Sequence, residues 1–342
     1  MQERECLLPC RRRCKVDKRK ILACAVVTVL AGGFLEAFQI QEAYYSEREK
    51  RITFIAPNGD PGYWTRIAEE IVKAAETDGM DVKCVSFREP EPVKQVEAVE
   101  SAIWSGVDGI ITAGIKDTPD VKRVIAQAEE AGIPVVLVDT DMEGSRRSCY
   151  VGADNYAAGK QAGRDMTAAC KASGNILVIV SNMDNCNQIQ RVKGFQEIME
   201  ENAGMEIADI LEGNSNEIYI RDEVVRILEE HPEINGIFCA EGYGTLCMGR
   251  LKSEAAKKYD TVKLVGFDGD IYVQEFLKNG LIDVNIQQDT EGLGRQAAQM
   301  LKQAMDEQRK YEDCYVEIVC LQPENYEEMS RYGDGEAIWH IY

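Results

Sequence analysis

The sequence predicts an α/β protein with two doubly wound parallel-sheet lobes, preceded by one N-terminal transmembrane helix. Three observations lead to this prediction. Short β-branched runs alternate with amphipathic helical stretches from residue 51 onward. These runs are too numerous for one comfortable sheet, and a chain of 342 residues is long enough for two domains. An apolar run at residues 21–38 follows directly after a basic segment.

The N-terminal segment differs in charge from the rest of the chain. Residues 1–20 contain eight basic and three acidic residues, whereas the whole chain has a formal net charge of −20. Residues 21–38 contain one charged residue, Glu36, and as a helix they would be about 27 Å long, enough for a thin bilayer core. Because cations remain on the cytoplasmic side, we expect residues 1–20 in the cytoplasm, 21–38 as a transmembrane signal-anchor and 39–50 as a linker.

A cleaved secretory signal peptide is the alternative for this segment. The anchor is favoured because no small-residue cleavage site followed by a polar stretch ends the apolar run. Both alternatives place the folded region outside the cytoplasm, in the cell envelope. The anchor would make the chain a single-pass protein of the cell membrane.

The first lobe is predicted to comprise residues 51–153 and 289–314. Its strands are expected at 51–56, 82–87, 108–112, 134–139 and 149–152. Its helices are expected at 64–78, 93–105, 121–130 and 292–308. The strand segments are short and apolar on both faces, which is typical of parallel strands covered by helices on both sides.

The second lobe is predicted to comprise residues 154–288 and 315–322, followed by a C-terminal tail at 323–342. Its strands are expected at 175–180, 206–211, 236–240, 262–267, 282–287 and 315–320. Its helices are expected at 155–171, 189–202, 222–230, 246–257 and 271–278. The division falls near residues 151–154, where the alternation pauses and then resumes.

Polar and aromatic residues follow the predicted strands. Ligands of doubly wound sheets bind beyond the carboxyl ends of the strands, so these residues are the candidate ligand contacts. Flat aromatic surface suits the C–H face of a sugar ring, and carboxylate, amide and guanidinium groups suit its hydroxyls. The same residue types also cap helices and fill cores, which is the structural alternative for each. The candidates are Tyr63, Trp64, Asp139, Asp141, Asn187, Arg191, Glu241, Asp268 and Gln288.

Other functional classes find little support in the sequence. The excess of acidic residues argues against nucleic-acid binding. Gly242 and Gly244 are not followed by a third glycine at the spacing of a dinucleotide-binding loop, which argues against dinucleotide binding. The run that begins at Asp139 resembles a calcium-binding loop, but it has Tyr150 at the position where such a loop requires glutamate. With two histidines in the chain, neither a catalytic triad nor a histidine metal site is expected. We therefore expect no enzyme activity, no cofactor and no metal.

The cysteines leave two alternatives open. Twelve are present, and eight of them lie in the predicted lobes. Eight cysteines allow about 105 pairings, so the sequence cannot assign disulfides. Several stand within apolar runs, where a thiol can equally be a small core residue.

From about residue 51 to 322 the order of motifs resembles the periplasmic sugar-binding proteins of the ribose-binding type, whose fold is shared by lactose-repressor-like ligand domains. The resemblance rests on FIAP at 54–57 with Gly62-Tyr63-Trp64, Asp108-Gly109-Ile110-Ile111, Gly132-Ile133-Pro134-Val135-Val136, Asp139-Thr140-Asp141 with Ser145, Arg147 and Tyr150 to Asn155, Asn187-x-x-x-Arg191-x-x-Gly194-Phe195, Val265-Gly266-Phe267-Asp268-Gly269, and Gln288.

The resemblance implies a type I periplasmic binding protein whose two lobes, joined by three crossings, close on a sugar. By position, Tyr63 and Trp64 would stack on the sugar ring, and Asp139 and Asp141 would bind hydroxyls from the first lobe. The second lobe would contribute Asn187, Arg191, Glu241, Asp268 and Gln288. The sequence departs from the ribose binder at Thr140, where an arginine is expected, and at Glu241, where Asn or Asp is usual, so the sugar need not be ribose.

Two functions are compatible with this family. The first is an extracytoplasmic solute-binding protein that delivers a sugar to the permease of an ABC importer. The alternative is a membrane-anchored sugar sensor that presents its bound state to a histidine kinase. The predicted anchor suits a stationary sensor, whereas importer receptors are usually released or lipid-tethered. A cytoplasmic repressor fits less well because an apolar span replaces the DNA-binding headpiece.

Overall fold

The computed structural model describes residues 49–58, 62–88, 91–307, 309–327 and 340–341. The predicted cytoplasmic segment, the transmembrane segment at 21–38, most of the linker and much of the C-terminal tail lie outside these residues. Residues Lys50–Tyr342 form one compact unit. Among the helices of the described part, none has both the length and the apolar character that a membrane span requires.

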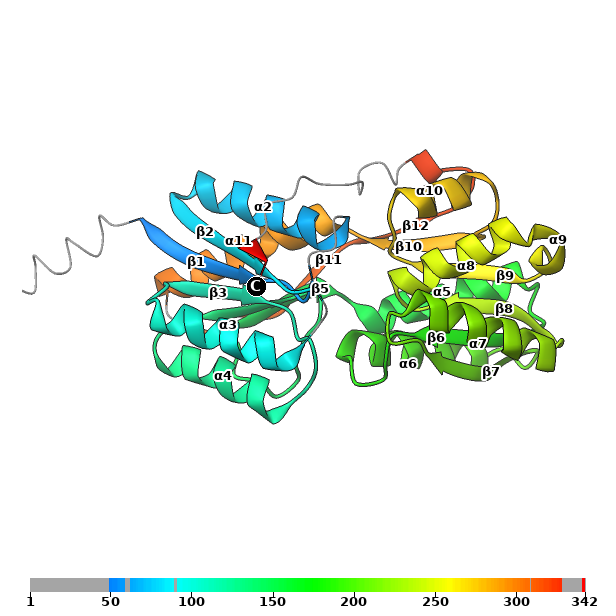
Figure 1. The fold of residues 1–342 in the computed structure, drawn as a ribbon, viewed down its shortest axis with the longest axis horizontal. Coiled ribbons are helices and arrows are strands. Elements are labelled where there is room, and N and C mark those ends of the chain that lie inside the picture. The colour runs from blue at the N-terminus through cyan, green and yellow to red at the C-terminus, as the bar shows by residue number, and fades with distance from the viewer. Residues whose placement is uncertain (1–48, 59–61, 89–90, 308, 328–339, 342) are drawn as a thin grey trace, which may run out of the picture. The chain divides into compact units, whose positions relative to one another are not determined.

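The first sheet has seven strands in the order β11-β5-β4-β3-β1-β2-β13, and all its neighbouring strands are parallel (Figure 1). Its strands are β1 (Lys50–Ile55), β2 (Met80–Ser86), β3 (Gly109–Thr112), β4 (Val135–Val138), β5 (Cys149–Ala153), β11 (Cys314–Val316) and β13 (His340–Ile341). Its helices are α2 (Tyr63–Thr77), α3 (Pro92–Trp104), α4 (Pro119–Glu130) and α11 (Thr290–Glu307).

Alternation along the strands divides the apolar side chains of this lobe between two cores. Phe54 and Val136 point toward α2 and α11, whereas Ile55 and Val135 point toward α3 and α4. Figure 1 shows these two helix pairs on opposite faces of the sheet. Burial on both faces explains why the strands are apolar throughout.

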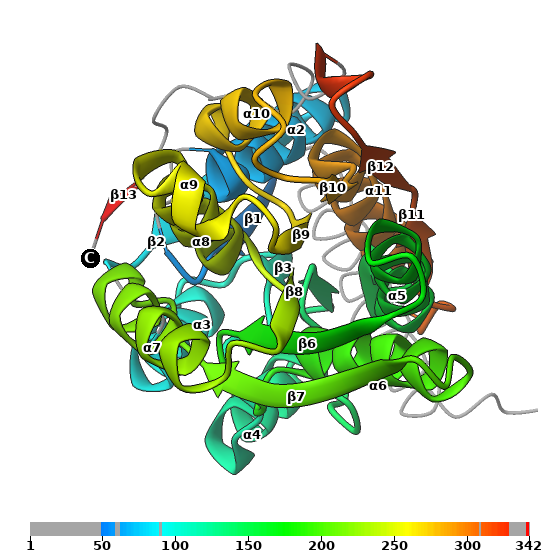
Figure 2. The same cartoon turned by 90° about the vertical axis from the view of Figure 1, so that its right-hand side faces the viewer.

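The second sheet has six strands in the order β12-β10-β9-β8-β6-β7. They are β6 (Gly174–Val180), β7 (Met205–Glu212), β8 (Ile234–Cys239), β9 (Lys263–Phe267), β10 (Val284–Gln288) and β12 (Ile318–Leu321). The helices are α5 (Asn155–Ala169), α6 (Cys186–Glu200), α7 (Glu217–Glu230), α8 (Gly242–Glu254), α9 (Ala256–Tyr259) and α10 (Ile271–Lys278). Figure 2 shows α5 and α7 on opposite sides of this sheet, and each side has its own apolar core.

The prediction of two parallel-sheet lobes is thus confirmed, with one antiparallel exception. Edge strand β12 runs antiparallel to β10. The segment 315–320, predicted as one strand, forms two strands on different sheets, β11 beside β5 and β12 beside β10. The chain changes sheet at Glu317, beyond the predicted boundary after Cys314, and the Glu317 carbonyl there accepts a hydrogen bond from Asp289 N.

Helix α7 begins five residues before the predicted helix at 222–230. Its first turn contains Ile218, Tyr219 and Ile220, and β-branched and aromatic residues have modest helix propensity. The Asn216 side chain accepts a hydrogen bond from Tyr219 N and so caps the helix. The cap, rather than the propensity of the first turn, determines where this helix begins.

The eight cysteines in the described residues are free thiols. Burial raises the pKa of Cys84 and of Cys149 to about 12, so both are protonated at neutral pH. The core-residue alternative therefore holds for the buried cysteines, which are Cys84, Cys149, Cys239 and Cys247, and no disulfide joins any pair in the described part of the chain.

Candidate ligand-binding site

A cavity of about 210 Å³ lies where the carboxyl ends of the two sheets meet. It is smaller than the roughly 300–1,000 Å³ of sites for drug-sized ligands. The loops after β1, β3 and β4 line it from the first lobe, and the loops after β6, β7, β8 and β9 line it from the second, together with the starts of α2, α6 and α8. This is the position expected for the ligand site of doubly wound sheets.

Seven of the nine candidate residues line the cavity: Tyr63, Trp64, Asp139, Asn187, Arg191, Glu241 and Asp268. Asp141 and Gln288 do not. Sequence reasoning missed further lining residues, among them Asn58, Ile115, Thr140, Ser181, Tyr243 and Asp270. Each of these follows a strand, so their position was the available signal, but their chemistry did not distinguish them from ordinary loop residues.

Tyr63 and Trp64 stand at the start of α2. The Trp64 side chain is only 7% exposed and belongs to the core of the first lobe, where its ring lies 6.5 Å from that of Phe54. The Tyr63 ring meets Trp64 edge-on at 5.3 Å, and its hydroxyl donates to Asp139 Oδ1 at 2.5 Å. Burial and the neighbouring carboxylates raise the pKa of Tyr63 well above its usual value, so the hydroxyl remains a donor. Trp64 thus serves both the core and the cavity wall.

Asp139 and Asp268 occupy equivalent positions in the two lobes. Each follows a central strand, β4 or β9, and each has a left-handed backbone conformation, with φ of 66° and 52°. Non-glycine residues adopt this conformation at a cost in free energy, and such strain concentrates at functional sites. Both carboxylates line the cavity. Burial raises the pKa of Asp268 to about 6, although Arg191 opposes the shift.

Gln288 connects these groups from behind the cavity. It ends β10 and is fully buried. Its Nε2 lies 2.9 Å from Tyr63 Oη, 2.8 Å from Asp268 Oδ2 and 3.4 Å from Asp139 Oδ1. Gln288 is not among the residues that line the cavity, and its Nε2 is used to hold side chains of both lobes, whereas its Oε1 has no hydrogen-bond partner among the described residues. The direct contact of Gln288 with a ligand stays a prediction.

Arg191 is the largest fully buried side chain of the described residues, with 2% exposure. Its guanidinium lies over the Phe267 ring at 3.5 Å, Nε donates to Asn155 Oδ1 at 2.8 Å, and Nη1 donates to the Ala240 carbonyl at 2.8 Å. Its Nη2 has no hydrogen-bond partner. A buried donor left unsatisfied is costly, and because the Arg191 side chain lines the cavity, an oxygen of a ligand there is a candidate acceptor for it.

Close packing of α5 against α6 holds Arg191 in place. A Cβ atom on Gly159 of α5 would lie 2.0 Å from the Arg191 carbonyl oxygen, and one on Gly194 of α6 would lie 2.1 Å from the Tyr156 carbonyl oxygen. Glycine is therefore required at both positions for the helices to approach this closely.

Glu241 both caps a helix and lines the cavity. It precedes α8, where its Oε1 accepts from Gly244 N at 2.7 Å and its Oε2 accepts from Tyr243 N at 2.8 Å. Burial raises the pKa of Glu241 to about 7, although these two backbone donors oppose the shift. Near neutral pH this carboxyl therefore exchanges between its charged and neutral forms.

Asn187 and Thr140 connect the lobes directly. Asn187 Nδ2 donates to Thr140 Oγ1 at 3.0 Å, and the Thr140 hydroxyl donates to Asp139 Oδ2 at 2.7 Å. Both residues are buried and line the cavity. The small Thr140 side chain leaves Asp139 without an adjacent cation.

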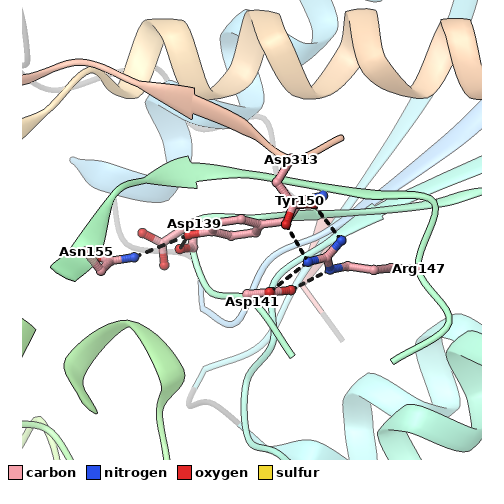
Figure 3. Close-up of polar contacts among 6 residues, drawn as sticks. All are labelled: Asp139, Asp141, Arg147, Tyr150, Asn155 and Asp313. Atoms are coloured by element: carbon pink, nitrogen blue, oxygen red, sulfur yellow. Dashed lines mark hydrogen bonds and ion pairs between the residues drawn. The ribbon is translucent and has the colours of Figure 1, made fainter. Parts of the chain in front are cut away.

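Asp141 lies outside the cavity, and the role predicted for it needs correction. Figure 3 shows Asp141 facing Arg147, which donates from Nε and Nη2 to the two carboxylate oxygens at 2.5 and 2.8 Å. The opposite side of the same guanidinium donates to Asp313 at 2.7 and 3.0 Å. Asp141 is therefore held in a structural ion pair and borders a separate cavity beside the lobe crossings.

Two α/β lobes joined by three crossings, with a polar cavity at the facing strand ends, define a type I periplasmic binding protein. Residues 52–309 match the family model described as "Periplasmic binding protein domain", and the chain belongs to this family. The family resemblance inferred from the motifs is thus confirmed.

Two curated proteins are similar to this chain in sequence. The D-apiose import binding protein of Paraburkholderia graminis is 25% identical over 238 residues, which cover 69% of this chain and 75% of the relative. The ribose import binding protein RbsB of Bacillus subtilis is 21% identical over 237 residues, with coverage of 69% and 75%.

Solved structures have the same fold. GanP, a glucose-galactose binding protein from Geobacillus stearothermophilus, superimposes with a TM-score of 0.77 at 24% identity, covering 82% of this chain and 99% of GanP. A chain of the XylFII-LytSN complex superimposes with a TM-score of 0.74 at 26% identity, covering 81% of this chain and 99% of that chain.

Proposed function

We propose that this chain is an extracytoplasmic solute-binding protein that encloses a sugar between its two lobes and delivers it to an ABC importer. The unsatisfied, buried Nη2 of Arg191 at the cavity carries the proposal, because it needs an acceptor that the described residues do not provide. The names of the relatives, which describe import binding proteins for D-apiose and ribose, support a sugar as the ligand.

The chemistry of the lining residues also supports a sugar. Tyr63 and Trp64 offer aromatic surface, whereas Asp139, Asp268 and Arg191 offer charged hydrogen-bonding groups. A hydrogen bond to a charged group contributes about 1.5–3 kcal/mol, so a few of them suffice for micromolar binding after the ordering costs. Because the groups come from both lobes, a ligand that contacts them all would favour the arrangement in which the lobes lie together.

We propose binding without chemical conversion. The cavity lining of the described residues contains no histidine or cysteine to act as a base or nucleophile. His231 lies on the surface near Glu233. The carboxyls at the cavity are bonded to backbone, hydroxyl or amide donors, an arrangement suited to holding a ligand.

The proposal is tested with a thermal-shift screen of the purified full-length chain, in detergent if it partitions into membranes. Monosaccharides, disaccharides and polyols are the probes. At least one sugar is expected to raise the melting temperature, and Arg191→Ala should abolish this shift. Asp141→Asn is the control, since Asp141 lies outside the cavity, and it should retain the shift. Absence of any shift, or conversion of the sugar to a product, would contradict the proposal.

A membrane-anchored sensor that presents its sugar-bound state to a histidine kinase is the second candidate. The apolar segment at 21–38 favours it, and one structural neighbour was solved as a complex of two different proteins, XylFII and LytSN. Retention of the chain in membranes after a high-salt wash would support the anchor.

A deletion strain distinguishes the two candidates. Loss of uptake of the radiolabelled sugar would support the importer, whereas unchanged uptake with loss of the transcriptional response to the sugar would support the sensor.

A further inference from the structure

We propose that the natural ligand is an amino sugar, with its ammonium group held between the Glu241 and Asp268 carboxylates. This inference rests on the proposed sugar binding and makes it more specific. It follows from the side chains that line the cavity, among which buried carboxylates outnumber cations.

The carboxylates of Asp139, Glu241 and Asp268 are all more than nine-tenths buried and all line the cavity. Arg191 is the single basic residue among the described residues of the lining. Buried ionised groups are normally paired with an opposite charge. Although Glu241 is partly protonated near neutral pH, the carboxylates still outnumber the one guanidinium, so the cavity wall has a net negative charge.

Neutral donors account for the hydrogen bonds made to these three carboxylates. Asp139 accepts from the hydroxyls of Tyr63 and Thr140, Asp268 accepts from Gln288, and Glu241 accepts from the backbone of α8. Among the described residues no lysine, arginine or histidine nitrogen lies within ion-pair distance of any of the three. A cation is the missing partner, and a ligand is the group that can supply it.

Arg191 does not form an ion pair with them. Its hydrogen bonds go to Asn155 and to the Ala240 carbonyl, and its flat face lies on Phe267. The remaining Nη2 is a donor and needs an acceptor oxygen. The site therefore requires two features in one ligand, an oxygen for Arg191 and a cationic donor for the carboxylates. An amino sugar has both.

The position of the ammonium follows from the geometry of the second lobe. A Cβ atom on Gly242, directly after Glu241, would lie 3.7 Å from Asp268 Cβ, so the two acidic residues are neighbours at the cavity wall. Burial is the main cause of the raised pKa of Glu241, and the charge of Asp268 raises it further, whereas the backbone donors of α8 and the charge of Arg191 lower it. The positive charge of Arg191 thus acts on the pair without forming an ion pair with either carboxylate. Each carboxylate still has free lone pairs for a further donor.

The test compares three sets of sugars on the purified full-length chain by calorimetry at pH 7. These are glucosamine, galactosamine and mannosamine; their N-acetylated forms, which have no charge; and the parent neutral hexoses. At least one amino sugar is expected to bind ten times more tightly than its parent hexose and its N-acetylated form.

Glu241→Gln should reduce the ratio of amino-sugar to parent-hexose affinity about tenfold, because glutamine retains an oxygen for the helix cap but removes the charge. Asp268→Asn is the second variant should Glu241→Gln fail to fold. Asp141→Asn is the matched control and should leave the ratio unchanged.

A neutral hexose that binds as tightly as the best amino sugar, or tighter, would overturn this inference while leaving the proposed sugar binding intact. An unchanged affinity ratio in both Glu241→Gln and Asp268→Asn would also overturn it. Failure of every sugar to bind would instead contradict the proposed function itself.

Discussion

The two lobes each contain an arginine beside acidic residues, and the two arginines differ in how their donors are used. In the first lobe, Arg147 makes paired hydrogen bonds to Asp141 on one side and to Asp313 on the other. In the second lobe, Arg191 is more deeply buried, is bonded to neutral groups and has one nitrogen without a partner. Each guanidinium nitrogen of Arg147 therefore has a hydrogen-bond partner without a ligand, whereas one nitrogen of Arg191 lacks a partner in the described part of the chain.

The acidic residues differ in the same way. Asp141 has a cation, so its charge is balanced within the first lobe. Asp268 has an amide donor and a raised pKa, because burial is only partly compensated by Arg191. The nearness of an aspartate and an arginine therefore does not identify a ligand site, whereas a hydrogen-bonding group without a partner on a residue that lines a cavity does.

Arg191→Lys should weaken ligand binding more than any of the other changes described below. Lysine retains the charge but loses the planar fork, so it cannot donate to Asn155, to Ala240 and to a ligand oxygen together. We expect affinity for the tightest sugar of the screen to fall about a hundredfold, or roughly 3 kcal/mol, measured by calorimetry. An affinity within threefold of wild type would remove Arg191 from the site.

The next effect is the pH dependence of folding stability that arises from Glu241 and Asp268, two buried carboxyls without an ion-pair partner among the described residues. The folded-state pKa of Glu241, about 7, lies above its unfolded value, so its contribution to stability is fully present below about pH 4.5 and is lost as pH rises through 7. Asp268, with a pKa of about 6, acts in the same direction. The loss from Glu241 is on the order of 3 kcal/mol.

Thermal melts of the ligand-free chain between pH 4.5 and 8 check this sign. Glu241→Gln removes the titrating group, so the difference in stability between wild type and variant should change in favour of the variant as pH rises. A difference that is constant across this range would show that Glu241 has an ordinary pKa.

The matched substitution Arg147→Lys should lower stability and leave binding nearly unchanged. Lysine cannot form two paired contacts at once, so we expect a loss of about 1–2 kcal/mol in the free energy of unfolding, measured by denaturant titration. Sugar affinity should stay within about threefold. A loss of affinity as large as that of Arg191→Lys would mean that both arginines belong to the site.

The smallest effect is expected at an exposed ion pair between loops of the two lobes. Lys116 Nζ lies 2.8 Å from Asp184 Oδ2, and both side chains are more than half exposed. Water screens such pairs, so Lys116→Ala should change sugar affinity less than threefold by calorimetry. A tenfold loss would mean that this pair, rather than the buried contact between Asn187 and Thr140, holds the lobes together.

Much of the candidate site was predictable from the sequence because it follows from strand position. Asp139, Glu241 and Asp268 stand directly after apolar runs, and parallel strands bring their carboxyl ends to one edge. Asp141 met the same criterion and lies elsewhere, because only the fold shows that Arg147 and Asp313 bind it. Gln288 also follows this pattern, and only packing shows that its side chain lies behind the cavity wall.

The local structure follows from the sequence alone: apolar runs buried on both faces, helices between them, and polar residues at the strand ends. These properties depend on residues a few positions apart, so periodicity reveals them. The tertiary structure alone decided which strand joins which sheet at Glu317, which arginine is already paired, and which carboxylates share a cavity without a cation. Those outcomes depend on contacts between residues far apart in the chain, and no local pattern encodes them.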